Sequence, residues 1–500
     1  MADTTARLEP ISLPPEDAED DAPSHSALSL RGVFSVLVSS GSGRAGIAMF
    51  IALIAISAWV LLTYPRDFGA DRWSAPLIWA DNPRTAPPSW TSLWNDNAIE
   101  HQVLIETEPV STEARGPAEV RTYDVVIHHD TSAPPQFLSA TVTGVTYNDR
   151  APIIIVSLLR PDGGEIRLAN VAVTAPRSGE EAPYQRFFET PERILLTQQD
   201  TAEQAIQEWF ASQYQDAAPI SDLGGQLNAA FFGVPTEDGT IESLRGEYTV
   251  RTQYVVANVD DSLEEVEVIY AGNVYGLMGT DSLGRDLFEG LLYGFPVALL
   301  IAAMAALLST LIGASLGIVS GFAGGKTDTL IQRLTDVVSN VPVLPLLIFL
   351  VFIAGSHLYL IILVLVAFSW TGLTIVVRSM VLQLRSGQLV EAARALGASR
   401  TRIMLRHVFP QVAPFIVAQM IFFAPGAILA EASLSFLGLG DPSVPTWGQM
   451  LEAGFRTGAL YVGYWWWVIP PGVLIIVTAM AFMFLALGME QVVDPRLREP

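Results

Sequence analysis

Six separate apolar stretches, each long enough to cross a lipid bilayer as a helix, constrain the fold of this chain more than any other feature. A membrane span needs about 20 apolar residues, because each adds about 1.5 Å to a helix and the hydrocarbon core is about 30 Å thick. The stretches cover residues 46–64, 296–320, 334–355, 358–377, 412–436 and 466–488. The mean hydropathy of +0.38 fits this pattern. The sequence therefore predicts an α-helical polytopic membrane protein with six transmembrane helices.

The distribution of basic residues predicts how these helices are oriented. Six arginines lie between residues 378 and 406, after the fourth stretch, whereas the segment 438–465 contains only Arg456. Cytoplasmic loops of membrane proteins are enriched in Lys and Arg. We therefore expect a multi-pass protein of the cell (plasma or inner) membrane, with N- and C-termini cytoplasmic and residues 65–295 extracytoplasmic.

The segment before the first stretch has two compositional parts. Residues 1–26 are rich in proline and acidic residues and predict a disordered, acidic cytoplasmic leader. Residues 27–64 predict an amphipathic lead-in, which either lies along the inner membrane surface or simply precedes the helix, followed by transmembrane helix 1. The apolar stretch begins too far from the N-terminus for a signal peptide and lacks a small-residue cleavage site, so we expect it to remain as an anchor.

The long segment between the first two helices predicts a separate domain. Residues 65–295 hold 35 acidic and 14 basic residues, and therefore most of the net charge of −23. An acidic surface of this kind argues against nucleic acid as a partner. Alternating β-branched residues predict strands at 122–128, 137–147, 152–160 and 248–257, and a helix is expected at 202–214. We expect an α+β extracytoplasmic insert at 65–278, whose core must hold without disulfides because the chain has no cysteine.

The stretch EAARALGASRTRIMLRHVFP, residues 391–410, predicts a shaped loop between the fourth and fifth helices. Residues 391–396 are good helix formers, Gly397 can end a helix in the left-handed conformation, and Ser399 can cap the next one. We therefore expect two short helices joined by a bend. The second would present apolar anchors within a basic rim, suited to a groove on a soluble partner: Ile403 and Leu405 among Arg400, Arg402 and Arg406. An ordinary basic cytoplasmic loop is the alternative.

Motifs for nucleotide chemistry and for metal binding are incomplete in this sequence. GFAGGKTD at 321–328 ends like a phosphate-binding loop, but the first glycine of that motif falls on Ser320, and the segment joins two membrane helices. The stretch 385–396 echoes an ATPase signature but lacks its paired glycines. His128, His129 and Asp130 end a predicted strand, where neighbours point to opposite faces, so we expect solvated turn residues there. No catalytic, cofactor or metal site is predicted.

Two features within the apolar stretches invite a structural or a functional interpretation. Gly313, Gly317 and Gly321 form a small-residue stripe that would let another helix pack closely. Glu431 is a carboxylate in apolar sequence and is a possible pathway residue, although a hydrogen bond to a neighbouring helix would also satisfy it. Three prolines predict that the fifth helix is kinked: Pro410, Pro414 and Pro425.

Taken together and in order, several motifs resemble the C-type permease subunit of the dipeptide/oligopeptide (peptide/nickel) ABC importer family. These are GTDSLGRD at 279–286, AGGKTD at 323–328, the stretch 391–410, AEASLSFLGLG at 430–440, PTWGQML at 445–451 and Asp-Pro-Arg at 494–496. The resemblance covers about residues 274–496 and is specific as a set. The large insert is a departure, because typical family members have a much shorter segment there.

The resemblance implies a type I ABC importer permease fold, with residues 279–500 as a five-helix permease core and 388–410 as a cytoplasmic coupling loop. The ATPase-coupling residues that it implies are Glu391, Ala392, Ala393, Gly397, Arg402, Ile403, Leu405 and Arg406. The implied partners are a B-type permease subunit forming a heterodimer, two ABC ATPase subunits, an extracytoplasmic substrate-binding protein and membrane lipid. The chain would form half of a translocation pathway for di- or oligopeptides, with ATP hydrolysis in the partner subunits.

The alternative to an importer permease is a protein of another class, a membrane-anchored sensor or assembly scaffold that acts through its extracytoplasmic insert. Five apolar stretches after the insert exceed what an anchor requires. The sequence does not decide between peptides, nickel and other solutes as the transported substrate.

Overall fold

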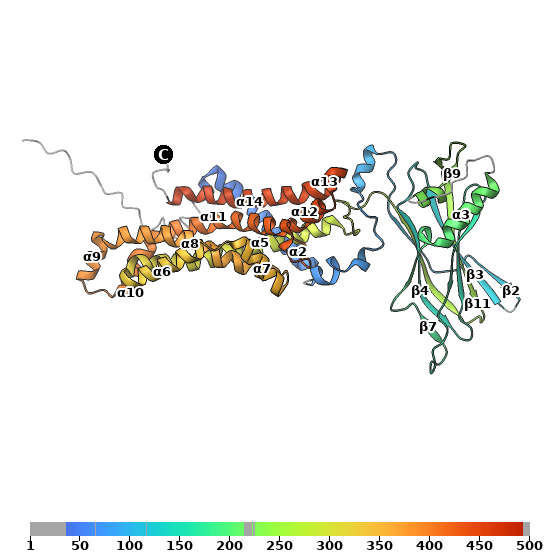
Figure 1. Cartoon of the computed structure of the whole chain (residues 1–500), viewed down its shortest axis with the longest axis horizontal. Helices are drawn as coiled ribbons and strands as arrows, with labels where there is room; N and C mark the ends of the chain where they lie inside the picture. The colour runs from blue at the N-terminus through green and yellow to red at the C-terminus, as the bar shows by residue number, and fades with distance from the viewer. Residues whose placement is uncertain (1–36, 66, 117, 215–222, 224–225, 494–500) are drawn as a thin grey trace, which may run out of the picture.

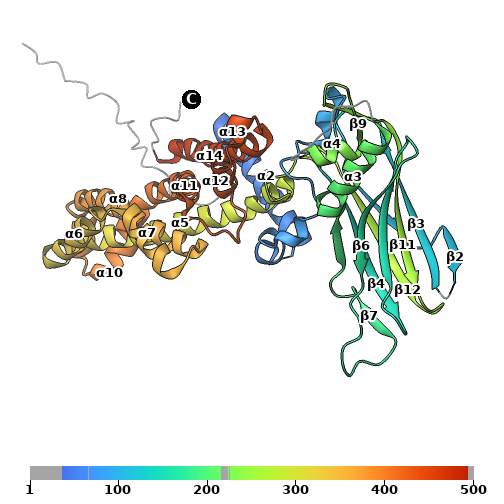
Figure 2. The same cartoon turned by 45° about the vertical axis from the view of Figure 1, so that its right-hand side comes forward.

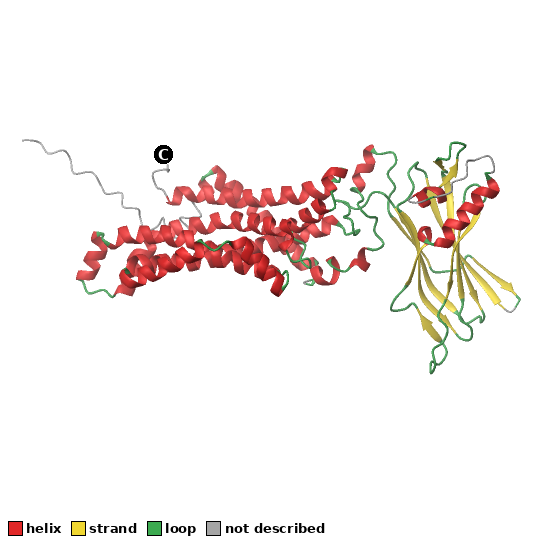
Figure 3. Ribbon diagram, viewed as in Figure 1, coloured by secondary structure: helices red, strands yellow, loops and turns green. Residues whose placement is uncertain are grey.

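The computed structural model describes residues 37–65, 67–116, 118–214, 223 and 226–493. The expected leader at 1–26, most of the lead-in and the motif at 494–496 lie outside these residues. The chain has two parts, a bundle of helices and a β-sheet domain attached at one end of it (Figures 1 and 3). We call that end of the bundle the insert end, and the opposite end, where residues 386–399 lie, the loop end.

Long apolar helices build the bundle. Among the described residues, five are long and apolar enough to span a membrane, and one bent pair brings the number to six, which confirms the predicted polytopic fold. The helices of the bundle are α2 (Gly41–Thr63), α5 (Leu287–Ala323), α6 (Gly325–Ser339), α7 (Val343–Ala354), α8 (Leu358–Arg385), α11 (Phe409–Leu434) and α14 (Trp465–Val493). α5 lies at the centre and packs against α8, α11 and α2. α14 packs against α2 and α11.

The third apolar stretch differs from its prediction. We expected one helix over 334–355, but α6 and α7 meet at an angle of 74°. Pro342 breaks the helix, since it has no N–H to donate and its ring disfavours helical geometry at the preceding residue. With 12 residues, α7 is about 18 Å long, shorter than the hydrocarbon core. This stretch is therefore a bent pair of helices.

Two other helices are longer than the apolar stretches that predicted them. α5 has 37 residues and begins at the N-cap Asp286, whose carboxylate accepts a hydrogen bond from Phe288 N at 2.8 Å. The fifth span belongs to a helical run that begins at Arg400 and is interrupted at Gly438, where φ is +79°, and α11 continues through Pro414 and Pro425 within it. Segments of π-helix lie at both ends of α11, and the expected kink stays a prediction.

The β-sheet domain consists of two antiparallel sheets packed face to face. The first contains β1 (Gln102–Glu106), β12 (Ser262–Ala271), β4 (Phe137–Tyr147) and β7 (Tyr184–Arg186), with β8 (Glu192–Leu195) also paired to β4. The second contains β2 (Ser111–Arg115), β3 (Ala118–His129), β11 (Gly246–Val256), β5 (Ile153–Leu159) and β6 (Glu165–Ala172). β9 (Gly233–Pro235) and β10 (Ile241–Ser243) form a hairpin. All four predicted strands are confirmed.

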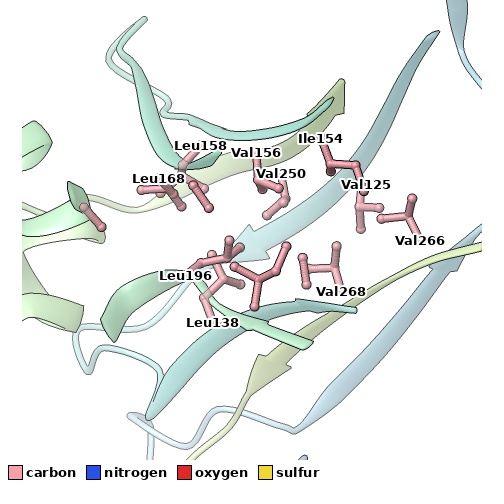
Figure 4. Close-up of a cluster of buried hydrophobic side chains, with 14 of the residues drawn as sticks. Val125, Leu138, Ile154, Val156, Leu158, Leu168, Leu196, Val250, Val266 and Val268 are labelled. Atoms are coloured by element: carbon pink, nitrogen blue, oxygen red, sulfur yellow. The ribbon is translucent and has the colours of Figure 1, made fainter. Parts of the chain in front are cut away.

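Aliphatic side chains from both sheets fill the space between them (Figure 4). Val125 and Val250 come from the second sheet, and Leu138 and Val268 from the first. Two helices close one end of this core: α3 (Asp200–Gln213), which confirms the predicted helix, and α4 (Leu227–Phe231). The core explains how the domain holds without disulfides, since burial of apolar side chains is the main stabilising term in folding.

A pair of irregular segments attaches this domain to the bundle. Residues 83–91 and 274–281 lie side by side, with Tyr275 N donating to Pro87 O at 2.8 Å and Thr280 N to Ala86 O at 2.9 Å. Arg193 of β8 donates from Nε to Asp81 Oδ1 at 2.5 Å, which ties the first sheet to the same region. The long strands run across the long axis of the helical bundle (Figures 1 and 2).

Candidate functional site

The loop between α8 and α11 begins with a short helix and a tight bend. α9 (Gln388–Ala395) carries the EAA motif. Gly397 follows with φ +78°, the left-handed conformation in which a side chain would be strained, and nothing lies within 4 Å of the place where its Cβ would be. Ser399 then caps the next helix, its hydroxyl accepting from Arg402 N at 3.4 Å. The bend at Gly397 and the cap at Ser399 lie where the sequence predicted them.

The sequence predicts a separate short helix as the second helix of this loop, but the structure shows a longer helix there. α10 (Arg400–Ile403) passes through the π-helical segment η6 (Met404–Val408) directly into α11, so one helical run extends from Arg400 to the end of α11 at Leu434. Pro410 lies inside this run, two residues after the π-helical segment, and the helix continues through it. The loop and the fifth span are therefore parts of one helical segment.

Burial divides the residues of the loop into two groups. Val390 and Ala393 of α9 belong to one buried apolar cluster with Ile403, Val408 and Val381, and Ile403 is only 1% exposed. Ile403 therefore cannot be an anchor for a partner protein, which corrects our prediction. It instead holds α9 against the start of the long helix and against α8. Burying one such side chain contributes about 1.5–3 kcal/mol.

The exposed face of the loop combines apolar and basic side chains. Leu396 is 88% exposed and Leu405 60%. Glu391, Ala392, Gly397 and Ser399 are also exposed. Four arginines surround them and form no ion pair with any described residue: Arg394, Arg400, Arg402 and Arg406. Sequence analysis missed Leu396, although an apolar residue directly before a helix-ending glycine was a usable signal.

The glycine stripe of α5 faces α8 at very short range. A Cβ on Gly313, Gly317 or Gly321 would lie 2.7–2.8 Å from the carbonyl oxygens of three α8 residues, namely Trp370, Thr374 and Arg378. The Thr374 hydroxyl donates to Gly313 O at 3.1 Å, which adds a polar contact between the two helices. The three glycines thus bring α5 and α8 close enough for backbone contact.

Glu431 is enclosed within the chain. It is 4% exposed, and the Ser435 hydroxyl donates to its Oε1 at 2.6 Å. The carboxylate also interacts with the hydroxyl of Thr446, which caps α12 (Trp447–Arg456). These contacts join the end of α11 to α12, as expected of a carboxylate satisfied by a neighbouring helix. The hypothesis that Glu431 contacts substrate stays a prediction.

The motif PTWGQML fixes α12 against the insert end of the bundle. Trp447 Nε1 donates to Leu291 O of α5 at 3.0 Å, and its indole lies over Gly294, where a Cβ would be 2.2 Å from Nε1. Gly448 packs on α11, since its Cβ would lie 2.6 Å from Ala432 Cα. One tryptophan and two glycines thus join α5, α11 and α12.

The motif GTDSLGRD shapes the turn that precedes α5. The Asp281 carboxylate accepts from Leu283 N at 2.8 Å, Arg285 N at 3.0 Å and Arg285 Nε at 2.6 Å. The Arg285 guanidinium in turn lies 4.2 Å from the centre of the Trp73 ring, a cation–π contact. The turn therefore joins the segments that attach the β-sheet domain to the start of the central helix α5.

The His128–His129–Asp130 segment differs from its prediction in one residue. His128 and Asp130 are exposed as expected, but His129 is fully buried. The Tyr270 hydroxyl lies 2.6 Å from its Nδ1, and Ser243 Oγ lies 3.1 Å from its Nε2. Burial lowers the pKa of His129 to about 4. The described residues contain no group of three His, Cys, Asp or Glu side chains that could hold a metal ion.

Comparison with known proteins identifies the family. Residues 313–499 match the profile of the binding-protein-dependent transport system inner membrane component. The dipeptide transport system permease protein DppC of Bacillus subtilis is 38% identical over 221 residues, which are 44% of this chain and 68% of DppC. The chain belongs to this family of permeases. The oligopeptide transport system permease protein OppC of the same organism is 35% identical over 222 residues, 44% of this permease and 72% of OppC.

The profile match leaves out the strands of the β-sheet domain, since it begins at residue 313 and the last strand ends at Ala271. The oligopeptide transport system permease protein OppC of Haemophilus influenzae matches to a similar extent, with 35% identity over 45% of this chain and 71% of its own length. A chain of the solved MetNI methionine ABC transporter, in an inward-facing form, aligns over 42% of this chain and 96% of its own at 19% identity and a TM-score of 0.34. The family assignment rests on the sequence relatives alone.

Proposed function

We propose that this permease forms half of the translocation pathway of an ABC importer for di- or oligopeptides and couples that pathway to ATPase subunits through residues 388–410. The relatives at 35–38% identity are named as dipeptide and oligopeptide permeases. The observation that carries the proposal is the combination of an exposed apolar and basic loop with an unbroken helical run from Arg400.

In this proposal, Leu396 and Leu405 insert into a groove of a partner ATPase, with the unpaired arginines at its rim. Closure of the ATPases on ATP displaces the loop as one body, because Ile403 and Ala393 lock α9 to the long helix. The movement reaches the fifth span because α10 continues into α11, and the fourth span because α9 packs against α8. Both spans shift together, which changes the side from which the pathway is open.

The remaining parts of the assembly follow from the same proposal. A B-type permease forms the other half of the pathway, two ABC ATPase subunits bind the coupling loops, and a substrate-binding protein delivers the peptide from outside. Lipid surrounds the bundle. The acidic β-sheet domain, facing outward, either docks the binding protein or caps the mouth of the pathway. The chain itself carries no ATPase chemistry in this scheme.

Co-purification of the ATPases tests the coupling proposal. Leu396→Asp and Leu405→Asp place a carboxylate on the exposed face without touching the buried contacts. We expect each to reduce recovery of the ATPases with the tagged permease and to lower peptide-stimulated ATP hydrolysis. Val259→Asp, at a residue of the β-sheet domain that is 73% exposed, is the matched control. Equal recovery of ATPases with all four forms would refute the assignment of this surface.

Deletion of the strands tests the role given to the β-sheet domain. Ile99 N donates to Asn273 Oδ1 at 2.8 Å, and Asn273 N donates to Ile99 O at 2.9 Å, so the two ends of the domain lie together. A short Gly-Ser linker can therefore replace residues 100–272. We expect peptide uptake and binding-protein association to be lost while the ATPases still co-purify. Full uptake by the shortened chain would remove this part of the proposal.

A further inference from the structure

A groove in the β-sheet domain has no part in the coupling loop or in the helical bundle. It has a volume of about 490 Å³ and is lined by parts of β6, β8 and α3. This volume falls within the range of about 300–1,000 Å³ in which small-ligand sites lie. The groove belongs to the part of the chain outside the family match at 313–499.

The lining residues show that the groove runs along the edges of two strands. Five consecutive residues of β6, 167–171, and three consecutive residues of β8, 192–194, line it. Successive side chains on a strand point to opposite faces, so consecutive residues can share one groove only along the strand's edge. β6 is the last strand of the second sheet, and β8 is the outermost strand on its side of β4. The groove is the open seam between the two sheets.

Part of the backbone on this edge is open: Arg167 and Asn170 are exposed, whereas Leu168 and Ala169 are buried where α3 packs against β6. Residues 167–171 make no backbone hydrogen bond to any described residue outside the ladder with β5. One side-chain contact reaches this edge, where the Thr201 hydroxyl donates to Leu168 O at 3.2 Å. That contact places the first turn of α3 beside β6 (Figure 2). Unpaired strand edges bind extended chains through main-chain hydrogen bonds.

Charges of both signs line the groove without partners. Arg167 of β6, Glu192 of β8 and Glu208 of α3 each line it, and their side chains form no ion pair or hydrogen bond with any described residue. Arg193, the other cation in the lining, is already paired with Asp81. A free peptide carries one positive and one negative terminus, which Glu192 or Glu208 and Arg167 can neutralise.

We propose that the groove between β6, β8 and α3 binds a short peptide with free termini in extended form, its backbone paired with the open edge of β6. Three extended residues span about 10 Å at about 3.3 Å each, which is shorter than the five-residue edge of β6. The inference goes beyond the proposed transport function, because it gives the β-sheet domain a ligand site of its own. It does not require that ATPases bind the loop.

Binding of trialanine to the purified full-length permease in lipid nanodiscs tests this site. We expect saturable binding by calorimetry, and a Kd about tenfold weaker for Arg167→Ala, which removes a charge-assisted hydrogen bond. Arg150→Ala is the matched control, since Arg150 is also an exposed arginine of this domain and does not line the groove. Arg167 is exposed, so its replacement should leave thermal unfolding unchanged.

Two modified peptides separate the parts of the proposal. Acetylated and amidated trialanine has no charged termini and should bind about tenfold more weakly or not at all. Trialanine methylated at its central nitrogen cannot donate there and should lose roughly two- to tenfold in affinity. Absence of trialanine binding up to about 10 mM, or equal loss in Arg167→Ala and Arg150→Ala, would overturn the proposal. ATPase co-purification is a separate readout, so failure of this site and failure of the transport proposal are distinguishable.

Discussion

Arg378 of α8 holds Asp328 of α6 through two parallel hydrogen bonds, Nε to Oδ1 at 2.6 Å and Nη2 to Oδ2 at 2.7 Å. The Ser320 hydroxyl of α5 donates to the same carboxylate at 2.5 Å. Three helices therefore meet at one carboxylate near the loop end. Two-pronged arginine–carboxylate pairs are among the stronger polar contacts in proteins and fix orientation as well as distance.

Replacing Arg378 tests the importance of this geometry. Arg378→Lys keeps the positive charge but offers only a point donor, and we expect it to lower the free energy of unfolding by about 1–2 kcal/mol. Thermal unfolding in detergent is the measurement. Arg394→Lys serves as the control, because Arg394 is exposed and has no ion pair with the described residues. Equal stability of both variants would show that the pair contributes little.

Adding a methyl group at Gly317 should separate α5 from α8. A Cβ there would lie 2.8 Å from Thr374 O and 2.8 Å from Val377 Cβ, and neither backbone nor a branched side chain can move aside easily. We expect Gly317→Ala to destabilise the bundle by about 1–3 kcal/mol. Gly372→Ala in α8 is the matched control, since its Cβ would have nothing within 4 Å. Because alanine favours helix over glycine, that control should be neutral or more stable in the same unfolding assay.

The β-sheet domain should lose stability below about pH 6.5 because of His129. The Ser243 hydroxyl donates to Thr131 O at 2.8 Å, so it must accept from His129 Nε2, which leaves Nδ1 to accept from Tyr270. The folded state therefore requires the neutral His129 ring, and the pKa of His129 in the folded state is about 4. In the unfolded chain the pKa of His129 is near 6.5, so the unfolded state takes up the proton at a higher pH than the folded state does. The contribution of the neutral His129 ring to the free energy of unfolding is fully present above about pH 6.5. As the pH falls towards 4, this free energy decreases by at most about 3 kcal/mol.

Comparison of two histidine variants isolates this effect from the titration of carboxylates. His129→Gln should flatten the dependence of the unfolding temperature on pH between 6.5 and 4, at the expense of lower stability at neutral pH. His128→Gln, at the exposed neighbour, should keep the full dependence of the unmodified chain. The interpretation fails if both variants follow the same curve of unfolding temperature against pH.

The absence of cysteine allows a clean test of membrane orientation. A single cysteine at Val259, which is 73% exposed on the β-sheet domain, should react with a membrane-impermeant maleimide on intact cells. A single cysteine at Leu396, which is 88% exposed at the loop end, should react only after the membrane is permeabilised. The reverse pattern would invert the orientation that the arginine distribution predicts. The unmodified chain is its own blank, because it has no thiol to label.

The local features of this fold could be predicted from the sequence because each depends on residues close together in the chain. Apolar length predicted the membrane helices, alternation of β-branched residues predicted strands such as β4, and the conformational freedom of Gly397 predicted the bend after α9. The angle between α6 and α7 was the exception, although Pro342 was a visible signal.

Only the tertiary structure decided which of these side chains are buried and what they contact. Ile403 and Leu405 are two residues apart and both apolar, yet Ile403 packs beneath α9 while Leu405 is exposed. His129 is buried because β10 and β12 bring Ser243 and Tyr270 to it from more than a hundred residues away. The groove at β6 exists because folding brings β6, β8 and α3 together. Periodicity and propensity are properties of neighbouring residues, whereas burial and pairing arise from segments that only folding brings together.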